Sequence, residues 1–201
     1  MLGLRHATDA DHVVAVTTIM SRERRVWASA IIGAMWGLGH TITVLLVGGA
    51  IVLFRLVVPP RLGLGMELAV AVMLVALGVA NLRGASRARP ARHPARPVLV
   101  GVVHGLAGSA AAALLVLSTI SGAAWGLFYL LLFGLGTVAG MMLLTTAMAW
   151  PIAFTAGRVA RTGDWLARAT GLGSVLLGAF VAYRVCVTHG LLSAAPHWTP
   201  Q

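Results

Sequence analysis

The stretch VWASAIIGAMWGLGHTITVLLVGGAIVLF, residues 26–54, contains no Asp, Glu, Lys or Arg. A helix needs about 20 consecutive apolar residues to cross the hydrocarbon core of a bilayer, so this stretch is long enough to span one. Four further runs are also mostly apolar: Leu62–Leu82, Val98–Ile120, Ala123–Trp150 and Leu166–Val187. Their repetition predicts an all-α protein that crosses a membrane several times.

The composition supports the same class. Hydrophobic residues make up 59% of the 201 residues and charged residues make up 10%, whereas soluble domains carry about 25% charged residues. The mean hydropathy is +0.91. We therefore expect the lipid bilayer to be the main partner of the protein surface, and the composition leaves a homo-oligomer open.

The net charge of +10 comes from arginine alone, because the chain contains no lysine. The arginines lie between the apolar runs and form no single basic face, so we expect no nucleic-acid partner. Most of them fall in the loops after the first, third and fifth spans, which predicts that these loops face the cytoplasm of a bacterium and that the protein lies in the cytoplasmic (inner) membrane. Cys186 is the only cysteine, which excludes an internal disulfide and a dithiol redox pair.

A sixth span is expected at Met1–Met20, although hydropathy alone argues against it. Its first half is interrupted by Arg5, His6, Asp9, Asp11 and His12. Its second half, Val13–Met20, is apolar and ends before a cluster of arginines. The segment also matches a later span, so we expect about six transmembrane helices in all.

An internal repeat supports that number. Gly3-Leu-Arg-His6 aligns with Gly101-Val-Val-His104, and Gly37-Leu-Gly-His40 aligns with Gly134-Leu-Gly-Thr137 after one gap. If each half has three helices, the second half enters the membrane from the opposite side and the repeat is inverted. Transporters commonly have this plan, with the substrate site near the midplane between the repeats.

The repeat also predicts the domain organisation. The first three-helix repeat would occupy residues 1–83, and the second would occupy residues 98–201. Residues 84–97 are rich in Arg and Pro, which is typical of a linker on the cytoplasmic side.

The strongest chemical signal is the segment His6-Ala-Thr-Asp9-Ala-Asp11-His12. An ionised side chain inside a span costs about 2.5–3.5 kcal/mol on insertion scales, so two acids and two histidines in seven residues need compensation. A bound dication would supply it, because carboxylates neutralise its charge and neutral imidazoles donate nitrogen. These ligands suit nickel, cobalt and zinc.

The spacing of this segment leaves two arrangements open. On a regular helix His6, Asp9 and His12 form one slanted stripe, whereas Asp11 lies about 140° from His6. Either Asp11 faces another helix or the helix is irregular here. The alternative to a metal site is a solvated N-terminal tail whose acids cap a helix.

Two more histidines lie inside spans and are flanked by small residues. His40 follows Gly37 and Gly39, and His104 precedes Gly105. Small residues let helices approach closely, which would bring both imidazoles to the opening segment. Each could instead be a histidine that is hydrogen-bonded to a neighbouring carbonyl. The candidate metal ligands are therefore His6, Asp9, Asp11, His12, His40 and His104.

These motifs resemble the nickel/cobalt transporter family. Its hallmark, a histidine followed after four residues by Asp-His, is similar to the segment from His6 to Asp11-His12, and its Leu-Gly-His motif is similar to Leu38-Gly39-His40. The second half resembles the small urease-accessory, UreH-like membrane branch. The resemblance covers most of the chain and implies that His6, Asp11, His12 and His40 recognise the metal.

The leading hypothesis is a secondary transporter that moves Ni²⁺ or Co²⁺ through the His/Asp site, with the ion as substrate and no cofactor. One alternative is a membrane accessory protein that delivers metal to urease or hydrogenase. Another is metal efflux, which the single linker histidine, His93, does not favour. An intramembrane hydrolase using Ser109 is a third, but His104 is poorly placed for it on the same helix. We therefore expect that the chain is not an enzyme.

Overall fold

The computed structural model describes residues 2–21, 23, 25–84, 95–120, 122–156, 162–193 and 196–198. Within these ranges all the regular elements are helices. They are α1 (Leu2–His6), α2 (Ala10–Met20), α3 (Val26–Thr43), α4 (Gly49–Phe54), α5 (Pro60–Leu82), α6 (Ala95–Thr119), α7 (Ala123–Ala156) and α8 (Thr162–Tyr183). A π-helical turn, η1 (Val44–Gly48), joins α3 to α4, and another, η3 (Arg184–Thr188), continues α8.

Four described segments are long and apolar enough to cross a membrane, and they match four of the five plain spans. They are Val26–Phe54, Pro60–Leu82, Ala123–Pro151 and Asp164–Thr188. The expected all-α membrane protein is thus confirmed. In α6 only the part Ala95–Gly108 counts as a shorter apolar helix, and Met1–Met20 is divided into α1 and α2, so the number six stays a prediction. The expected linker at 84–97 lies mostly outside the described residues.

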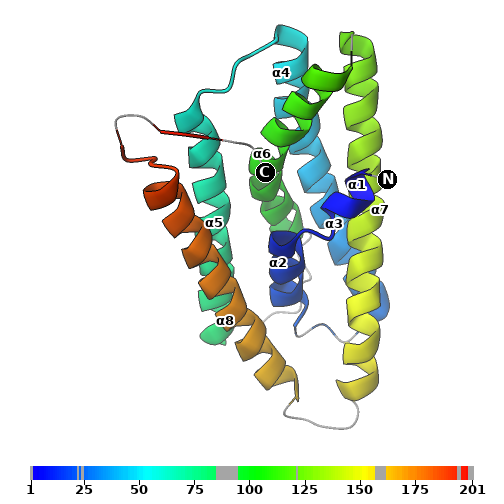
Figure 1. The fold of residues 1–201 in the computed structure, drawn as a ribbon. Helices are drawn as coiled ribbons and strands as arrows, with labels where there is room; N and C mark the ends of the chain where they lie inside the picture. Colours follow the sequence, from blue (N-terminus) through cyan, green and yellow to red (C-terminus); the bar gives the residue numbers. More distant parts are fainter. Residues whose placement is uncertain are drawn as a thin grey trace.

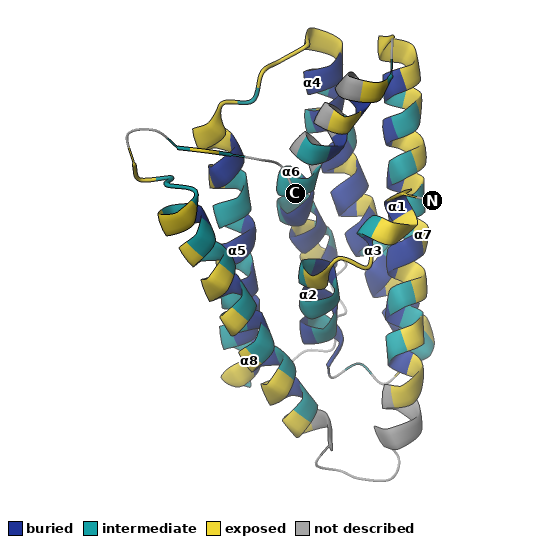
Figure 2. Ribbon diagram, viewed as in Figure 1, coloured by how far each residue is buried: buried dark blue, intermediate teal, exposed yellow. Residues whose placement is uncertain are grey.

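The helices form two groups. In Figure 1, α3, α6 and α7 stand together, α5 and α8 lie side by side, and α2 lies between the groups. The main buried cluster lies where these groups meet, with members from α2, α3, α5, α6 and α7; it includes Met20, Trp36, Leu74, Val100 and Met141. Figure 2 shows that exposed residues line the outward faces of the helices. Many of them are large apolar residues, which suits a surface that contacts lipid.

Small residues set the close helix contacts in α3–α7. A Cβ added to Gly33 would lie 2.6 Å from the Met141 carbonyl oxygen, and one added to Gly37 would lie 2.7 Å from Cα of Val138. Residue numbers rise along α3 as they fall along α7, so the two helices are antiparallel. Backbones that approach this closely tolerate only glycine at the contact.

The pair α5–α8 repeats this arrangement. A Cβ on Gly78 would lie 2.5 Å from the Gly171 carbonyl oxygen, and one on Gly178 would lie 2.7 Å from the Ala71 carbonyl oxygen. This pair is also antiparallel.

The close contact between α3 and α6 fixes the position of His40. A Cβ on Gly105 would lie 2.8 Å from the His40 carbonyl oxygen, and one on Gly101 would lie 2.9 Å from the His40 backbone nitrogen. The Gly39 position is equally tight, because its Cβ would collide with the Val98 carbonyl. The backbone of α6 therefore lies directly on the turn of α3 that carries His40.

Close contacts at glycines also hold helix α1 against α7. Gly3 packs against the backbone of α7 near Phe133, and a Cβ on Gly140 would lie 2.7 Å from Cβ of Ala7. The chain then turns at Ala7–Asp9 before α2 begins, so the opening segment is not one regular helix. Because of this turn, α1 and α2 approach the same part of the core from different directions.

A buried amide ties α2 to the α5–α8 pair. Nδ2 of Asn81 donates to the Thr18 carbonyl oxygen at 3.1 Å and to Oγ of Ser21 at 3.0 Å, and Oγ1 of Thr170 lies 3.4 Å away. Asn81 is itself buried. The end of α2 is therefore fixed to α5 and α8 by polar contacts that lipid cannot replace.

We expect Asn81→Leu to lower thermal stability, because it removes the donor to the Thr18 carbonyl and to Oγ of Ser21 and leaves that carbonyl with Oγ of Ser21 as its side-chain partner. The free energy of unfolding should fall by about 1–2 kcal/mol, measured by thermal unfolding in detergent. Val72→Ala on the outward face of the same helix is the matched control and should have little effect. Equal unfolding temperatures for wild type and Asn81→Leu would show that the amide does not stabilise α2.

Candidate metal centre

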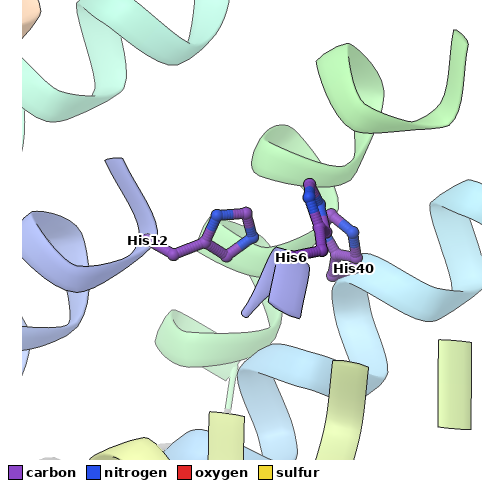
Figure 3. A group of neighbouring side chains, drawn as sticks. All are labelled: His6, His12 and His40. Carbon is purple, nitrogen blue, oxygen red and sulfur yellow. The ribbon is translucent and has the colours of Figure 1, made fainter. Parts of the chain in front are cut away.

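Four imidazoles from four helices converge in the core. His6 comes from α1, His12 from α2, His40 from α3 and His104 from α6. The ring centroids of His12 and His104 are 4.1 Å apart, those of His6 and His12 are 4.6 Å apart, and those of His6 and His40 are 5.2 Å apart. Figure 3 shows three of these side chains turned toward one another. Only His6 is partly exposed; the other three are buried.

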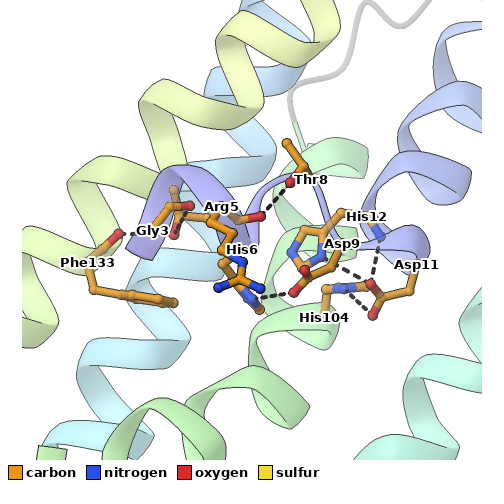
Figure 4. Close-up of polar contacts among 10 residues, drawn as sticks. Gly3, Arg5, His6, Thr8, Asp9, Asp11, His12, His104 and Phe133 are labelled. Atoms are coloured by element: carbon orange, nitrogen blue, oxygen red, sulfur yellow. Dashed lines mark hydrogen bonds and ion pairs between the residues drawn. The ribbon is translucent and has the colours of Figure 1, made fainter. Parts of the chain in front are cut away.

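Asp11 joins two of the imidazoles. Nδ1 of His12 lies 3.3 Å from Oδ1 of Asp11, and Nε2 of His104 donates to Oδ2 of Asp11 at 3.1 Å. The backbone N–H of His12 donates to Oδ1 at 2.9 Å. These contacts are visible in Figure 4. Asp11 therefore faces both its own helix and α6.

Asp9 plays a different part. Nδ1 of His6 donates to Oδ2 of Asp9 at 2.8 Å, and the side chain of Asp9 is 53% exposed. Asp9 lies at the N-cap position of α2, but its side chain makes no capping hydrogen bond. It therefore orients the His6 ring from the outer side, and the structure does not bring it to the other histidines.

The remaining imidazole nitrogens are buried without a partner. Within the described residues these are Nε2 of His6, Nε2 of His12, both ring nitrogens of His40 and Nδ1 of His104. A buried nitrogen without a hydrogen bond is costly. His6, His12 and His104 each have one nitrogen on a carboxylate and the other free, which is the arrangement that orients histidines toward a metal.

The ligand atoms fall into two groups that share one residue. His6, His12 and His40 form the first group, and Asp11, His12 and His104 form the second. In each group one ligand atom from every residue lies within 4.8 Å of the others. Imidazole nitrogen and carboxylate oxygen are ligands of divalent first-row metals such as nickel, cobalt and zinc.

Two residues that were not among the candidate site residues also line the site. Trp36 is fully buried and stacks on His12, with ring centroids 5.9 Å apart and planes 12° apart. A Cβ on Gly108 would lie 3.2 Å from Nε2 of His6 and 3.2 Å from Cε1 of His40. Trp36 lies four residues before His40, and Gly108 lies four after His104. A spacing of four residues places Trp36 on the same helix face as His40 and Gly108 on the same helix face as His104. The sequence therefore contained a signal for both positions.

The structure shows both of the arrangements left open for the opening segment. The helix is irregular, because the chain turns between α1 and α2, so the regular-helix stripe through His6, Asp9 and His12 is wrong. Asp11 also faces another helix, α6. The alternative of a solvated tail is also wrong, because α1 packs on α7 and His12 is only 1% exposed. The side chain of Ser109, invoked for a hydrolase, lies outside the described residues.

Comparison with known proteins gives one informative relative. The chain is 34% identical over 209 residues to the urease accessory protein UreH of Bacillus sp. (strain TB-90). The alignment covers 95% of this chain and 91% of the relative. No family model matches the chain, and no solved structure matches it.

Proposed function

The chain belongs to the family of the urease accessory protein UreH, and from that premise we propose that it is a secondary transporter of Ni²⁺ or Co²⁺ in the bacterial cytoplasmic membrane. The observation that carries the proposal is the group of four imidazoles and Asp11 on four helices, in which His12, His40 and His104 are buried. A polar group of this size inside apolar helices is costly unless it binds a cation. The relative's urease link favours nickel handling.

The donor set supports this class of substrate. Three neutral imidazoles can replace the hydration shell of a borderline dication, and Asp11 offsets one of its two charges. No cysteine lies in the described cluster, so a thiolate-preferring ion is not favoured. We also propose that the protein is not an enzyme.

The packing supports a two-fold plan for transport. Under the repeat assignment, α3 corresponds to α7, α5 to α8, and the opening segment to α6. Two of these pairs, α3–α7 and α5–α8, pack antiparallel, as an inverted repeat with an axis in the membrane plane requires. We propose six crossings in two such repeats, with the metal centre between the opening segment and α6 and with alternating access produced by rocking of the repeats.

A second candidate function is metal delivery to urease without sustained transport. The name of the relative favours it. The same buried centre would then hold an ion until a soluble partner accepts it. Efflux has less support, since the linker at residues 84–97 contains a single histidine, His93.

Reconstitution separates transport from delivery. Proteoliposomes containing the protein should accumulate Ni²⁺ or Co²⁺ along an imposed metal gradient without any partner protein. His104→Ala should reduce uptake by about 10- to 100-fold, because it removes one ligand and one anchor of Asp11. His197→Ala, the same change at an exposed histidine of the C-terminal segment, should leave uptake unchanged. Tight binding without accumulation would instead support delivery, and normal uptake by His104→Ala would reject this centre.

A further inference from the structure

We propose that the metal centre contains two alternative stations that share His12, and that one ion exchanges between them. The tri-imidazole station consists of His6, His12 and His40. The carboxylate station consists of Asp11, His12 and His104. This inference rests on the proposed transport of a divalent cation and adds a step to it.

The distances favour two stations over one cage. Ligand atoms that lie within 4.8 Å of one another form two sets of three, and His12 alone belongs to both. The ring centroids of His40 and His104 are 6.1 Å apart, the widest separation recorded among these imidazoles. Rings this far apart can share an ion only when it lies close to the line between them, so an ion at the tri-imidazole station is poorly placed to bind His104 and Asp11 as well.

His12 is placed to keep hold of the ion throughout. Its ring centroid lies 4.6 Å from that of His6, 5.4 Å from that of His40 and 4.1 Å from that of His104. Its Nε2 is free, and its ring stacks on Trp36, which limits its tilt. The ion can thus exchange its other ligands while it stays on His12.

The two stations differ in charge. The tri-imidazole station carries no formal charge, because Asp9 lies on the far nitrogen of His6. The carboxylate station contains the anion of Asp11, which attracts a dication directly, although its side chain is 39% exposed. A dication should therefore rest at the carboxylate station and visit the tri-imidazole station during passage.

The exchange needs no proton donor or acceptor from outside. As the ion reaches the carboxylate station, Asp11 turns an oxygen toward it and releases its contacts with His12 and His104. The ring of His104 then turns so that Nδ1, which points away from Asp11 in the structure, faces the ion, and each imidazole keeps its proton on the other nitrogen. His6 and His40 regain free nitrogens, and the number of bound protons is unchanged.

Two variants separate the stations. His40→Ala should bind Co²⁺ in detergent within about threefold of wild type and keep its visible absorption spectrum, but lose uptake by about tenfold or more. Asp11→Asn should lose binding by about 10- to 100-fold and shift the spectrum toward all-nitrogen ligation. Wild type should bind one ion per chain at saturation. Thermal unfolding without metal, and a second variant His40→Gln, control for misfolding.

A single cage predicts a different outcome. His40→Ala and Asp11→Asn would then weaken Co²⁺ binding equally, and this result would overturn the two stations. Two ions per chain at saturation would also overturn the exchange, because both stations would then be filled together. If wild type binds the ion but proteoliposomes do not accumulate it, the proposed transport fails, and the binding of the two variants still decides between two stations and one cage.

Discussion

Replacing His12 by alanine is expected to abolish both metal binding and uptake. His12 belongs to both ligand groups, so its loss leaves only two ligands in each. Its backbone and ring also hold Asp11, which would lose the contact at 3.3 Å. Removing even an outer partner of a metal ligand costs about 10- to 100-fold in affinity, so loss of the shared ligand should exceed 100-fold. Isothermal titration with Ni²⁺ and proteoliposome uptake would measure the two effects.

The control must separate ligation from folding, because His12 is buried against Trp36. His12→Gln keeps much of the side-chain volume and should also lose metal, while unfolding near the wild-type temperature without metal. His197→Ala removes an exposed imidazole and should behave as wild type. If His12→Gln bound Ni²⁺ with an affinity close to that of wild type, the shared-ligand role would be wrong.

Much of the centre could be predicted from the sequence because charged groups are conspicuous in an apolar chain. Asp11 and His12 lie where an ionised or polar side chain must be compensated, and His40 and His104 lie beside glycines that permit close helix contacts. The structure brings these four side chains and His6 together. The membrane class followed from the same reasoning, since the apolar runs are too long and too numerous for a soluble core.

Other features needed three-dimensional information. The turn at Ala7–Asp9 depends on how α1 packs against α7, and no strong breaker marks it in the sequence. It decides that Asp9 orients His6 and does not join the other ligands. Trp36 and Gly108 could be placed on the right helix faces, but their contacts with the imidazoles depend on interhelical distances that a periodic pattern does not contain.

Gly108→Ala should stop uptake without removing any ligand atom. The added Cβ would lie 3.2 Å from Nε2 of His6 and 3.2 Å from Cε1 of His40, so a methyl group would intrude between two members of the tri-imidazole station. A displacement of about 1 Å in a functional geometry can cost on the order of 100-fold in rate. Nickel uptake by proteoliposomes should therefore fall by about tenfold or more.

Gly65→Ala in α5 is the matched control, because a Cβ there meets nothing within 4 Å. Both substitutions favour the helix by about 1 kcal/mol relative to glycine, so neither should lower the unfolding temperature through helix propensity. Binding of Co²⁺ by Gly108→Ala should persist, because the three atoms nearest to the added Cβ belong to His6 and His40, which are not part of the carboxylate station. Normal uptake by Gly108→Ala would show that the ion does not pass between His6 and His40. Loss of uptake with binding retained would instead show that space, as well as donor chemistry, governs passage from one station to the other.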